Sequence, residues 1–329
     1  MIKHYEKFIF LFVVIGAIFF ARTLYPNISG VPTLAGNDSP QTADAEQSVS
    51  EPPTLVLPQT TLGATAQPGG DSATAASATA SQAASTTHLP TFSSAAYLVA
   101  NLSTGNIAAG SNITSRWPTA SITKLMTATV ALDHLSSDAT ITITPQMFAA
   151  DPDEHTLVIG GTYTVEDLLH VMLMPSSNVA AEAMADYIGH AQFMTEMNQR
   201  AQAWGMTGTY FDDPSGISAA NQSTAKDLMT LAQHLYDSYP NILALTNTPA
   251  TTITEQNSGK KVTVRSINNF AGTAGFIGGK TGNTPQADAN LLSLFDDAGT
   301  PVVVVVLGAP ALPFQDTSML YTWYKMNYH

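Results

Sequence analysis

The sequence contains no cysteine and very few basic residues. Of its 329 residues only 12 are lysine or arginine, and the formal net charge is −13. The missing cysteine excludes disulfide bonds and thiolate zinc sites. The scarcity of positive charge excludes a basic surface for nucleic acid, so no nucleic-acid partner is expected. The eight histidines show no metal-ligand spacing, and neither a metal nor another cofactor is expected.

The N-terminus carries the one long apolar run. Lys3 and Lys7 flank the start of a segment in which every residue from Phe8 to Ala21 is apolar. Such a run is short for a membrane span and typical of a signal-peptide core. Because no small-x-small cleavage site follows closely, we expect residues 1–25 to be an uncleaved membrane anchor; the alternative is a protein secreted after signal cleavage. Either interpretation places the rest of the chain outside the cytoplasm.

Lysine and arginine are absent between Pro26 and His88, where serine, threonine, alanine and proline are frequent. A segment of this composition buries too little apolar surface to offset the entropy lost on ordering it. We therefore expect residues 26–90 to form a disordered linker with an end-to-end distance of about 45 Å. Residues 91–329 are expected to form the folded domain.

The periodicity of the remaining sequence changes twice. Residues 95–111 alternate in the manner of a β-hairpin, and residues 122–135 read as a helix that is apolar nearly all round. Helical patterns dominate residues 164–250, strand patterns return at 275–309, and an amphipathic stretch at 314–327 predicts a last helix. Strands at both ends with helices between them predict one α+β domain, with an antiparallel sheet from both ends and a central helical subdomain.

One short pattern, Ser-x-x-Lys, raises the question of a reactive serine. It occurs at Ser121 and Lys124, at Ser223 and Lys226, and at Ser258 and Lys261. The last copy has a hairpin-turn composition, and Ser223 has the position of a helix N-cap. Ser121 begins the apolar helix, so Lys124 is expected to be buried beside it. Burial lowers a lysine pKa and favours a neutral amine that can take a serine proton, but the local sequence alone fits a helix cap equally well.

Two further motifs follow at larger distance. The sequence Ser176-Ser177-Asn178 lies between two predicted helices, and Lys280-Thr281-Gly282 lies on a predicted strand. The ordered trio S-x-x-K, S-x-N and K-T-G resembles the penicillin-recognising serine acyl-transferases, and in particular the low-molecular-weight D-alanyl-D-alanine carboxypeptidases. The resemblance spans roughly residues 92–310 and includes the "FDDPSGIS" and "STAKDL" stretches. It implies a β-lactamase/transpeptidase-like fold.

The resemblance implies a catalytic trio. Ser121 would attack the carbonyl of a peptidoglycan stem peptide that ends in D-Ala-D-Ala, and Lys124 would act as the general base. Ser176 would be a proton-relay serine that bridges Lys124 and Lys280. The terminal D-alanine would leave from an acyl-enzyme that water then hydrolyses. β-Lactam antibiotics would acylate Ser121 as covalent inhibitors.

It also implies the substrate-binding groups. Asn178 would orient the base and the substrate amide, while Lys280 and Thr281 would bind the terminal carboxylate. Gly282 would let the strand backbone approach the substrate. The oxyanion would be held by the backbone N–H groups of Ser121 and Asn283. Two positions depart from the family pattern: Ser177, where glycine is frequent, and Asn283, a variable position.

Other functions of the same fold stay open. A D,D-endopeptidase, a β-lactamase-like hydrolase and a catalytically silent cell-wall-binding module would share these motifs. A class A β-lactamase needs a deacylating glutamate after the S-x-N motif, usually within E-x-x-L-N; no such sequence follows Asn178, and Glu166 precedes the motif. We therefore expect slow deacylation of penicillin.

A function of another class rests on "GFIGGKT", at residues 275–281, which nearly matches a phosphate-binding loop. Its first glycine is one residue too close to the second, and the sequence that follows is a poor helix start. Two further polar stretches are interpreted as structural: "DPDEH" at residues 151–155 as a solvated turn, and residues 212–216 as a tight turn.

Overall fold

The computed structural model describes residues 88–310 and 313–328. The chain divides into two units, residues 1–77 and 78–329, and the described residues belong to the second. The predicted anchor at residues 1–25 and nearly all of the predicted linker at 26–90 lie outside the described residues. Within the described part, no helix combines the length and the apolar character needed to cross a bilayer.

A five-stranded sheet forms one layer of the domain, with the strand order β2-β1-β11-β10-β9 and antiparallel neighbours throughout. Its strands are β1 (Ala96–Asn101), β2 (Ile107–Ser111), β9 (Phe276–Thr284), β10 (Asp288–Asp297) and β11 (Thr300–Ala309). Since β1 pairs with β11, the two N-terminal strands and the three C-terminal ones form one sheet, as the sequence predicts. The predicted α+β class and sheet are confirmed.

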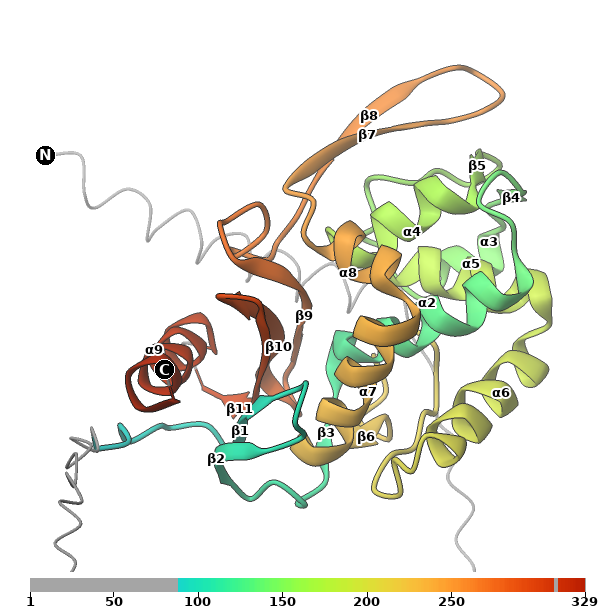
Figure 1. Cartoon of the computed structure of the whole chain (residues 1–329). Coiled ribbons are helices and arrows are strands. Elements are labelled where there is room, and N and C mark those ends of the chain that lie inside the picture. The colour runs from blue at the N-terminus through green and yellow to red at the C-terminus, as the bar shows by residue number, and fades with distance from the viewer. Residues whose placement is uncertain (1–87, 311–312, 329) are drawn as a thin grey trace, which may run out of the picture. The chain divides into compact units, whose positions relative to one another are not determined.

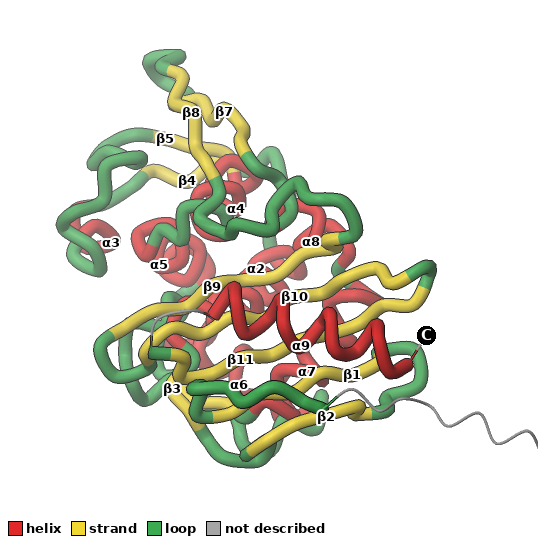
Figure 2. The backbone as a smooth tube through the Cα atoms, turned by 90° about the vertical axis from the view of Figure 1, so that its left-hand side faces the viewer, coloured by secondary structure: helices red, strands yellow, loops and turns green. Residues whose placement is uncertain are grey.

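The central strand β11 is buried on both faces. Its five consecutive valines, residues 302–306, have no exposed surface, and they alternate between two clusters of core residues. Val303 and Val305 face the cluster that includes the helical subdomain. Val304 and its even-numbered neighbours pack with Leu320 of helix α9 (Pro313–Tyr328). Figure 2 shows α9 lying along the outer face of the sheet.

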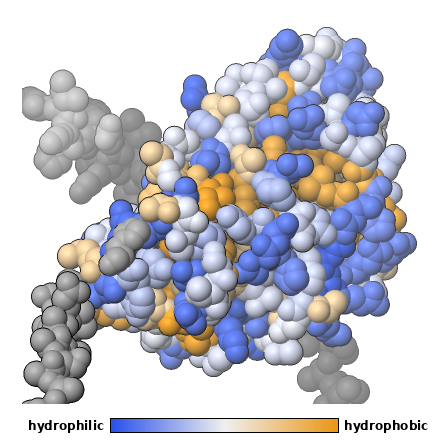
Figure 3. Space-filling model, in the orientation of Figure 1, coloured by the Kyte–Doolittle hydropathy of each residue, from blue (hydrophilic) through white to orange (hydrophobic). Residues whose placement is uncertain are grey.

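The helical subdomain covers the opposite face of the sheet and extends beyond it (Figure 1). Its helices are α2 (Thr123–His134), α3 (Pro145–Phe148), α4 (Val165–Leu173), α5 (Asn178–Ile188), α6 (His190–Ala203), α7 (Ala225–Ser238) and α8 (Pro240–Thr246). Helix α2 is its core element, because every residue from Thr123 to Ala131 is buried. Figure 3 shows a mainly hydrophilic face, with apolar residues gathered chiefly over this helical part.

Three short two-stranded sheets complete the domain. They pair β3 (Trp117–Pro118) with β6 (Gln222–Ser223), β4 (Thr140–Thr142) with β5 (Thr162–Thr164), and β7 (Ala250–Thr254) with β8 (Lys261–Arg265). Ser258 lies in the turn between β7 and β8, as predicted. The predicted cap at Ser223 is wrong by one residue. Thr224 caps α7 by accepting a hydrogen bond from Asp227 N, because Ser223 is still part of β6.

Candidate active site

Ser121 and Lys124 are brought together by a single helical turn. A short 3₁₀ helix, η1 (Ala120–Ile122), runs directly into α2, and Lys124 Nζ lies 2.8 Å from Ser121 Oγ. Ala120 has a φ of 47°, an uncommon value for a residue with a side chain. Such backbone strain is frequent at functional sites. Ser121 forms no helix cap, and its hydroxyl faces the amine of Lys124.

Lys124 has no exposed surface, and three oxygen atoms surround its amine. Besides Ser121 Oγ, these are Asn178 Oδ1 at 2.7 Å and the carbonyl oxygen of Ser215 at 2.6 Å. Each comes from a different element: η1, the start of α5, and the loop before β6. The amine is therefore fixed in position toward the serine without any contact to solvent.

Burial lowers the pKa of Lys124 to about 7, although the carboxylates of Asp213, Asp151 and Glu182 act in the opposite direction. A large fraction of the amine is neutral at neutral pH and can accept a proton. Burial also lowers the pKa of Lys280, and the neighbouring charge of Lys124 lowers it further. Burial is thus the main cause for both lysines.

The second motif meets the third through Ser176. Its hydroxyl lies 2.9 Å from Lys280 Nζ, which also donates to the carbonyl oxygen of Thr281 at 3.0 Å. Ser176 has a φ of 73°, a second strained backbone position. The predicted bridge to Lys124 is absent from the hydrogen bonds of the described residues. Ser176 contacts Lys280, and Asn178 is the member of this motif that contacts Lys124.

Ser177, the middle residue of the second motif, caps α5. Its Oγ accepts a hydrogen bond from Ala180 N at 3.2 Å, and it also donates to the carboxylate of Glu154. Asn178 Nδ2 donates to Asp151 Oδ2 at 3.0 Å. The turn predicted at residues 151–155 is present and three of its residues are exposed, but Asp151 and Glu154 contact the second motif, which the sequence did not predict. Sequence reasoning missed this contact because the two segments approach each other only through tertiary packing.

The third motif lies on β9 beside η1. A Cβ atom on Gly282 would lie 2.7 Å from the carbonyl oxygen of Thr119 and 3.2 Å from Ser121 N. The missing side chain therefore lets β9 approach η1, in addition to the predicted role toward substrate. Ser121, Ser176, Thr281, Gly282 and Asn283 line one cavity of about 440 Å³. Its other lining residues are Ile267, Ala289, Asn290, Pro313 and Phe314.

The tight turn at residues 212–216 is part of the same site. Asp213 accepts hydrogen bonds from Ser215 N and Oγ at 2.7 Å, Gly216 N at 2.6 Å, and Ser218 N and Asn221 Nδ2 at 2.7 Å. Burial opposes its ionisation, but these hydrogen bonds outweigh burial and keep the pKa of Asp213 below its ordinary value. The turn is present as predicted. The contact between the Ser215 carbonyl oxygen and Lys124 was not predicted.

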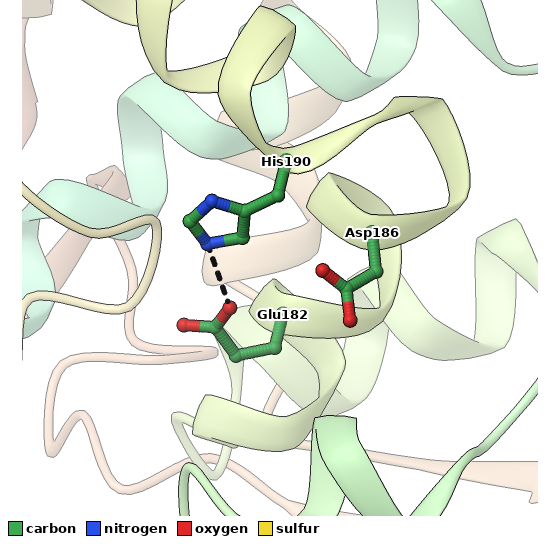
Figure 4. Close-up of side chains that lie close together, drawn as sticks. All are labelled: Glu182, Asp186 and His190. Atoms are coloured by element: carbon green, nitrogen blue, oxygen red, sulfur yellow. Dashed lines mark hydrogen bonds and ion pairs between the residues drawn. The ribbon is translucent and has the colours of Figure 1, made fainter.

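Figure 4 shows a group of three side chains: Glu182 and Asp186 of α5, and His190, the first residue of α6. Within the described residues this is the one group of His, Asp and Glu side chains close enough to share a metal ion, with ligand atoms within 4.8 Å of one another. Glu182 Oε2 and His190 Nε2 lie 3.2 Å apart. Burial raises the pKa of Glu182, and His190 partly offsets this. We assign the group an electrostatic effect, since Glu182 raises the pKa of Lys124.

The geometry disagrees with two alternative functions. Glu166 lies in the first turn of α4 and lines a separate cavity with Leu132 and Leu169, so it is not in the position of a deacylating residue beside Ser121. The "GFIGGKT" stretch is a strand that continues through Thr284 and is followed by strand β10. A phosphate-binding loop requires a helix there.

Comparisons with known proteins agree with this fold. The D-alanyl-D-alanine carboxypeptidase family, peptidase S11, matches residues 82–311. A D-alanyl-D-alanine carboxypeptidase from Streptomyces sp. (strain K15) is 29% identical, with 69% of this chain and 85% of the relative aligned. A D-alanyl-D-alanine endopeptidase from Escherichia coli (strain K12) is 31% identical, over 76% of this chain and 81% of that protein.

Solved structures of D,D-peptidases are similar to this domain in fold. The D-alanyl-D-alanine carboxypeptidase from Mycobacterium tuberculosis H37Rv superposes with a TM-score of 0.67 at 25% identity, covering 73% of this chain and 94% of that one. The Streptomyces K15 DD-transpeptidase gives a TM-score of 0.66 at 28% identity, covering 72% and 98%. The fold is thus β-lactamase/transpeptidase-like, the fold of penicillin-binding D,D-peptidases. The chain belongs to the D-alanyl-D-alanine carboxypeptidase family, and it is a hydrolytic peptidase.

Proposed function

We propose that this chain removes the terminal D-alanine from peptidoglycan stem peptides through an acyl-enzyme on Ser121. The observation that carries the proposal is the fully buried amine of Lys124, 2.8 Å from Ser121 Oγ, with a pKa of about 7. A neutral amine at hydrogen-bonding distance is the arrangement that activates a serine hydroxyl. Family membership supports the same reaction class.

In the first half-reaction Ser121 Oγ bonds to the carbonyl carbon of the penultimate D-alanine, and Lys124 takes the hydroxyl proton. The C–N bond to the terminal D-alanine breaks, and its nitrogen takes the proton of the Ser176 hydroxyl, which is replaced by the proton that Lys124 took from Ser121. Lys280 is hydrogen bonded to Ser176 and supports this transfer. In the second half-reaction Lys124 takes a proton from water, and the water oxygen bonds to the ester carbonyl carbon. The C–Oγ bond breaks, Ser121 Oγ takes the proton from Lys124, and the shortened peptide leaves with a free carboxylate.

Substrate recognition is proposed for the opposite side of the cavity. A free C-terminal carboxylate of the substrate binds beside Lys280 and Thr281. Its negative charge raises the pKa of the buried Lys280 amine. The backbone N–H groups of Ser121 and Asn283 hold the oxyanion. Ile267, Pro313 and Phe314 form an apolar wall of the same cavity.

The test is release of D-alanine from a synthetic stem pentapeptide. We expect the wild type to release one D-alanine per peptide and the Ser121→Ala variant to release none. A wild type that cleaves cross-linked muropeptides but not the pentapeptide contradicts the carboxypeptidase assignment and favours the endopeptidase. A wild type that cleaves neither favours the cell-wall-binding module.

We further propose that residues 1–25 anchor the enzyme in the membrane and that residues 26–90 let it act in the layer outside. Support comes from the apolar run after Lys7 and from the composition of the linker, which contains no lysine or arginine. Fractionation of cells that express the full chain tests this. Recovery of the intact chain in the membrane fraction is expected, and release of a shortened chain into the medium contradicts the anchor.

A further inference from the structure

A loop that carries two carboxylates lies against the second motif. Asp151 and Glu154 follow α3, and they accept hydrogen bonds from Asn178 Nδ2 and Ser177 Oγ respectively. The loop backbone forms its own turn, since Glu154 N donates to the carbonyl oxygen of Asp151 at 3.1 Å and Asp151 N donates to that of Phe148 at 3.2 Å. The two carboxylates are therefore presented to the start of α5 by a turn that continues α3.

The side-chain amide of Asn178 has two ends of similar shape and opposite chemistry. Oδ1 can only accept hydrogen bonds, and Nδ2 can only donate them. In the structure Oδ1 lies 2.7 Å from Lys124 Nζ, and Nδ2 donates to Asp151 Oδ2 at 3.0 Å. Rotation of the amide by half a turn would set Nδ2 against the amine and Oδ1 against the carboxylate. A carboxylate accepts only, so Asp151 selects the orientation that gives Lys124 an acceptor.

We propose that Asp151 is a positioning residue for Lys124, which it affects by fixing the amide orientation of Asn178, and that the contact between Glu154 and Ser177 holds its loop in place. This role rests on the proposed function, in which Lys124 is the base for Ser121. Among the described residues, Asp151 has no hydrogen bond to Lys124 or Ser121 themselves. Its influence therefore passes through Asn178 or through its charge.

The charge and the orientation can be separated by two substitutions. The charged groups that act on Lys124 are Asp213 from the loop before β6, Glu182 from α5, Asp151, and Lys280 from β9. Asp151→Asn removes one negative charge but keeps an oxygen that can accept from Asn178. Asp151→Ala removes both the charge and the acceptor. A positioning role thus predicts different results for the two variants.

The experiment measures the second-order rate constant for acylation by a fluorescent penicillin across pH. Both variants are expected to shift the acidic limb of the profile to lower pH, because loss of the carboxylate lowers the pKa of Lys124. Asp151→Ala is also expected to lower the plateau rate about tenfold, and Asp151→Asn about threefold or less. The matched control is Asp153→Asn, an exposed carboxylate of the same loop, which should change neither quantity.

A double-mutant cycle tests the route through Asn178. In an Asn178→Ala background, Asp151→Ala should cause no further loss of plateau rate, because the amide it orients is gone. Equal losses in both backgrounds would overturn the inference, as would an Asp151→Ala variant that acylates like Asp153→Asn. If thermal unfolding shows that Asp151→Ala does not fold, the same cycle is run with Asp151→Leu, which also lacks an acceptor but keeps a side chain of similar size. A wild type that takes no label contradicts the proposed function itself.

Discussion

At the scale of single residues, the site depends on two buried lysines that each face a serine. Lys124 lies beside Ser121, and Lys280 lies beside Ser176. Transfer of an ammonium group from water to a buried position is costly, so burial favours the neutral amine. Since two positive charges at Lys124 and Lys280 would also repel each other, the free protein favours the neutral form of these amines. In the proposed reaction, the substrate carboxylate raises the pKa of Lys280, while Lys124 acts as the base.

The pKa of Lys124 predicts the pH dependence of acylation. Below about pH 7 the amine is protonated and cannot accept the Ser121 proton, so the rate should fall up to tenfold for each pH unit. Above that pH the rate should reach a plateau. Labelling rates with fluorescent penicillin between about pH 5 and pH 9 measure this limb.

A matched variant checks that the limb belongs to Lys124. Glu182 raises the pKa of this lysine, so Glu182→Gln should move the limb to lower pH. Glu166→Gln should leave the limb at the same pH, because Glu166 lies in the first turn of α4 and lines a different cavity from Ser121. A rate that does not vary with pH in the wild type would contradict Lys124 as the base.

At the scale of elements, the start of α2 is held in shape by two close backbone approaches. Gly282 of β9 lies against Thr119 and Ser121, and Gly216 lies against Ala120 on the other side. A Cβ atom on Gly216 would be 1.9 Å from the carbonyl oxygen of Ala120. Because real Cβ atoms do not come this close to an oxygen, a side chain there must displace the turn that carries Ser121.

Gly216→Ala should therefore reduce both stability and acylation. We expect a loss of about 2 kcal/mol or more in the free energy of unfolding and at least a tenfold loss in acylation rate. The control is Gly259→Ala in the turn between β7 and β8, where φ is also positive (69° against 87°) but no atom lies within 4 Å of the new Cβ. Urea unfolding and penicillin labelling give the two quantities. Equal effects of both substitutions would contradict the close approach.

The sequence predicts the elements of this site better than their contacts. Period-two alternation and the valine run predict β1 and β11, and the all-round apolar pattern predicts the burial of Lys124 in α2. The ordered motifs also bring together Ser121, Asn178 and Lys280, although their roles stay predictions. The contacts of Asp151 and Ser215 could not be predicted, because turns carry no periodicity and meet these residues only through tertiary packing.

At the scale of the whole molecule, the sheet is a layer between the helical subdomain and α9. The first residues of α9, Pro313 and Phe314, line the cavity that contains Ser121, and its middle packs on β11 through Leu320 and Tyr324. The last helix therefore contributes to the core and to the cavity wall together. Its docking should matter for the stability of the domain and for the shape of the site.

Truncation of Leu320 tests this packing. Leu320 has no exposed surface, so Leu320→Ala should lower the free energy of unfolding by about 3 kcal/mol through lost burial and a residual cavity. Met326→Ala on the same helix, where 62% of the residue is exposed, should change it by less than about 0.5 kcal/mol. Urea titrations measure both. A loss at Leu320 no larger than at Met326 would show that α9 does not hold the sheet.

If Ser121 is the nucleophile of a D,D-peptidase, a penicillin must form its covalent adduct on Ser121, and mass spectrometry can locate that adduct. Incubation with a penicillin, proteolysis and mass spectrometry should find one adduct, on the peptide that contains Ser121, and it should persist because deacylation is slow. The Ser121→Ala variant should carry none. An adduct on another residue, or equal labelling of wild type and Ser121→Ala, would contradict the account.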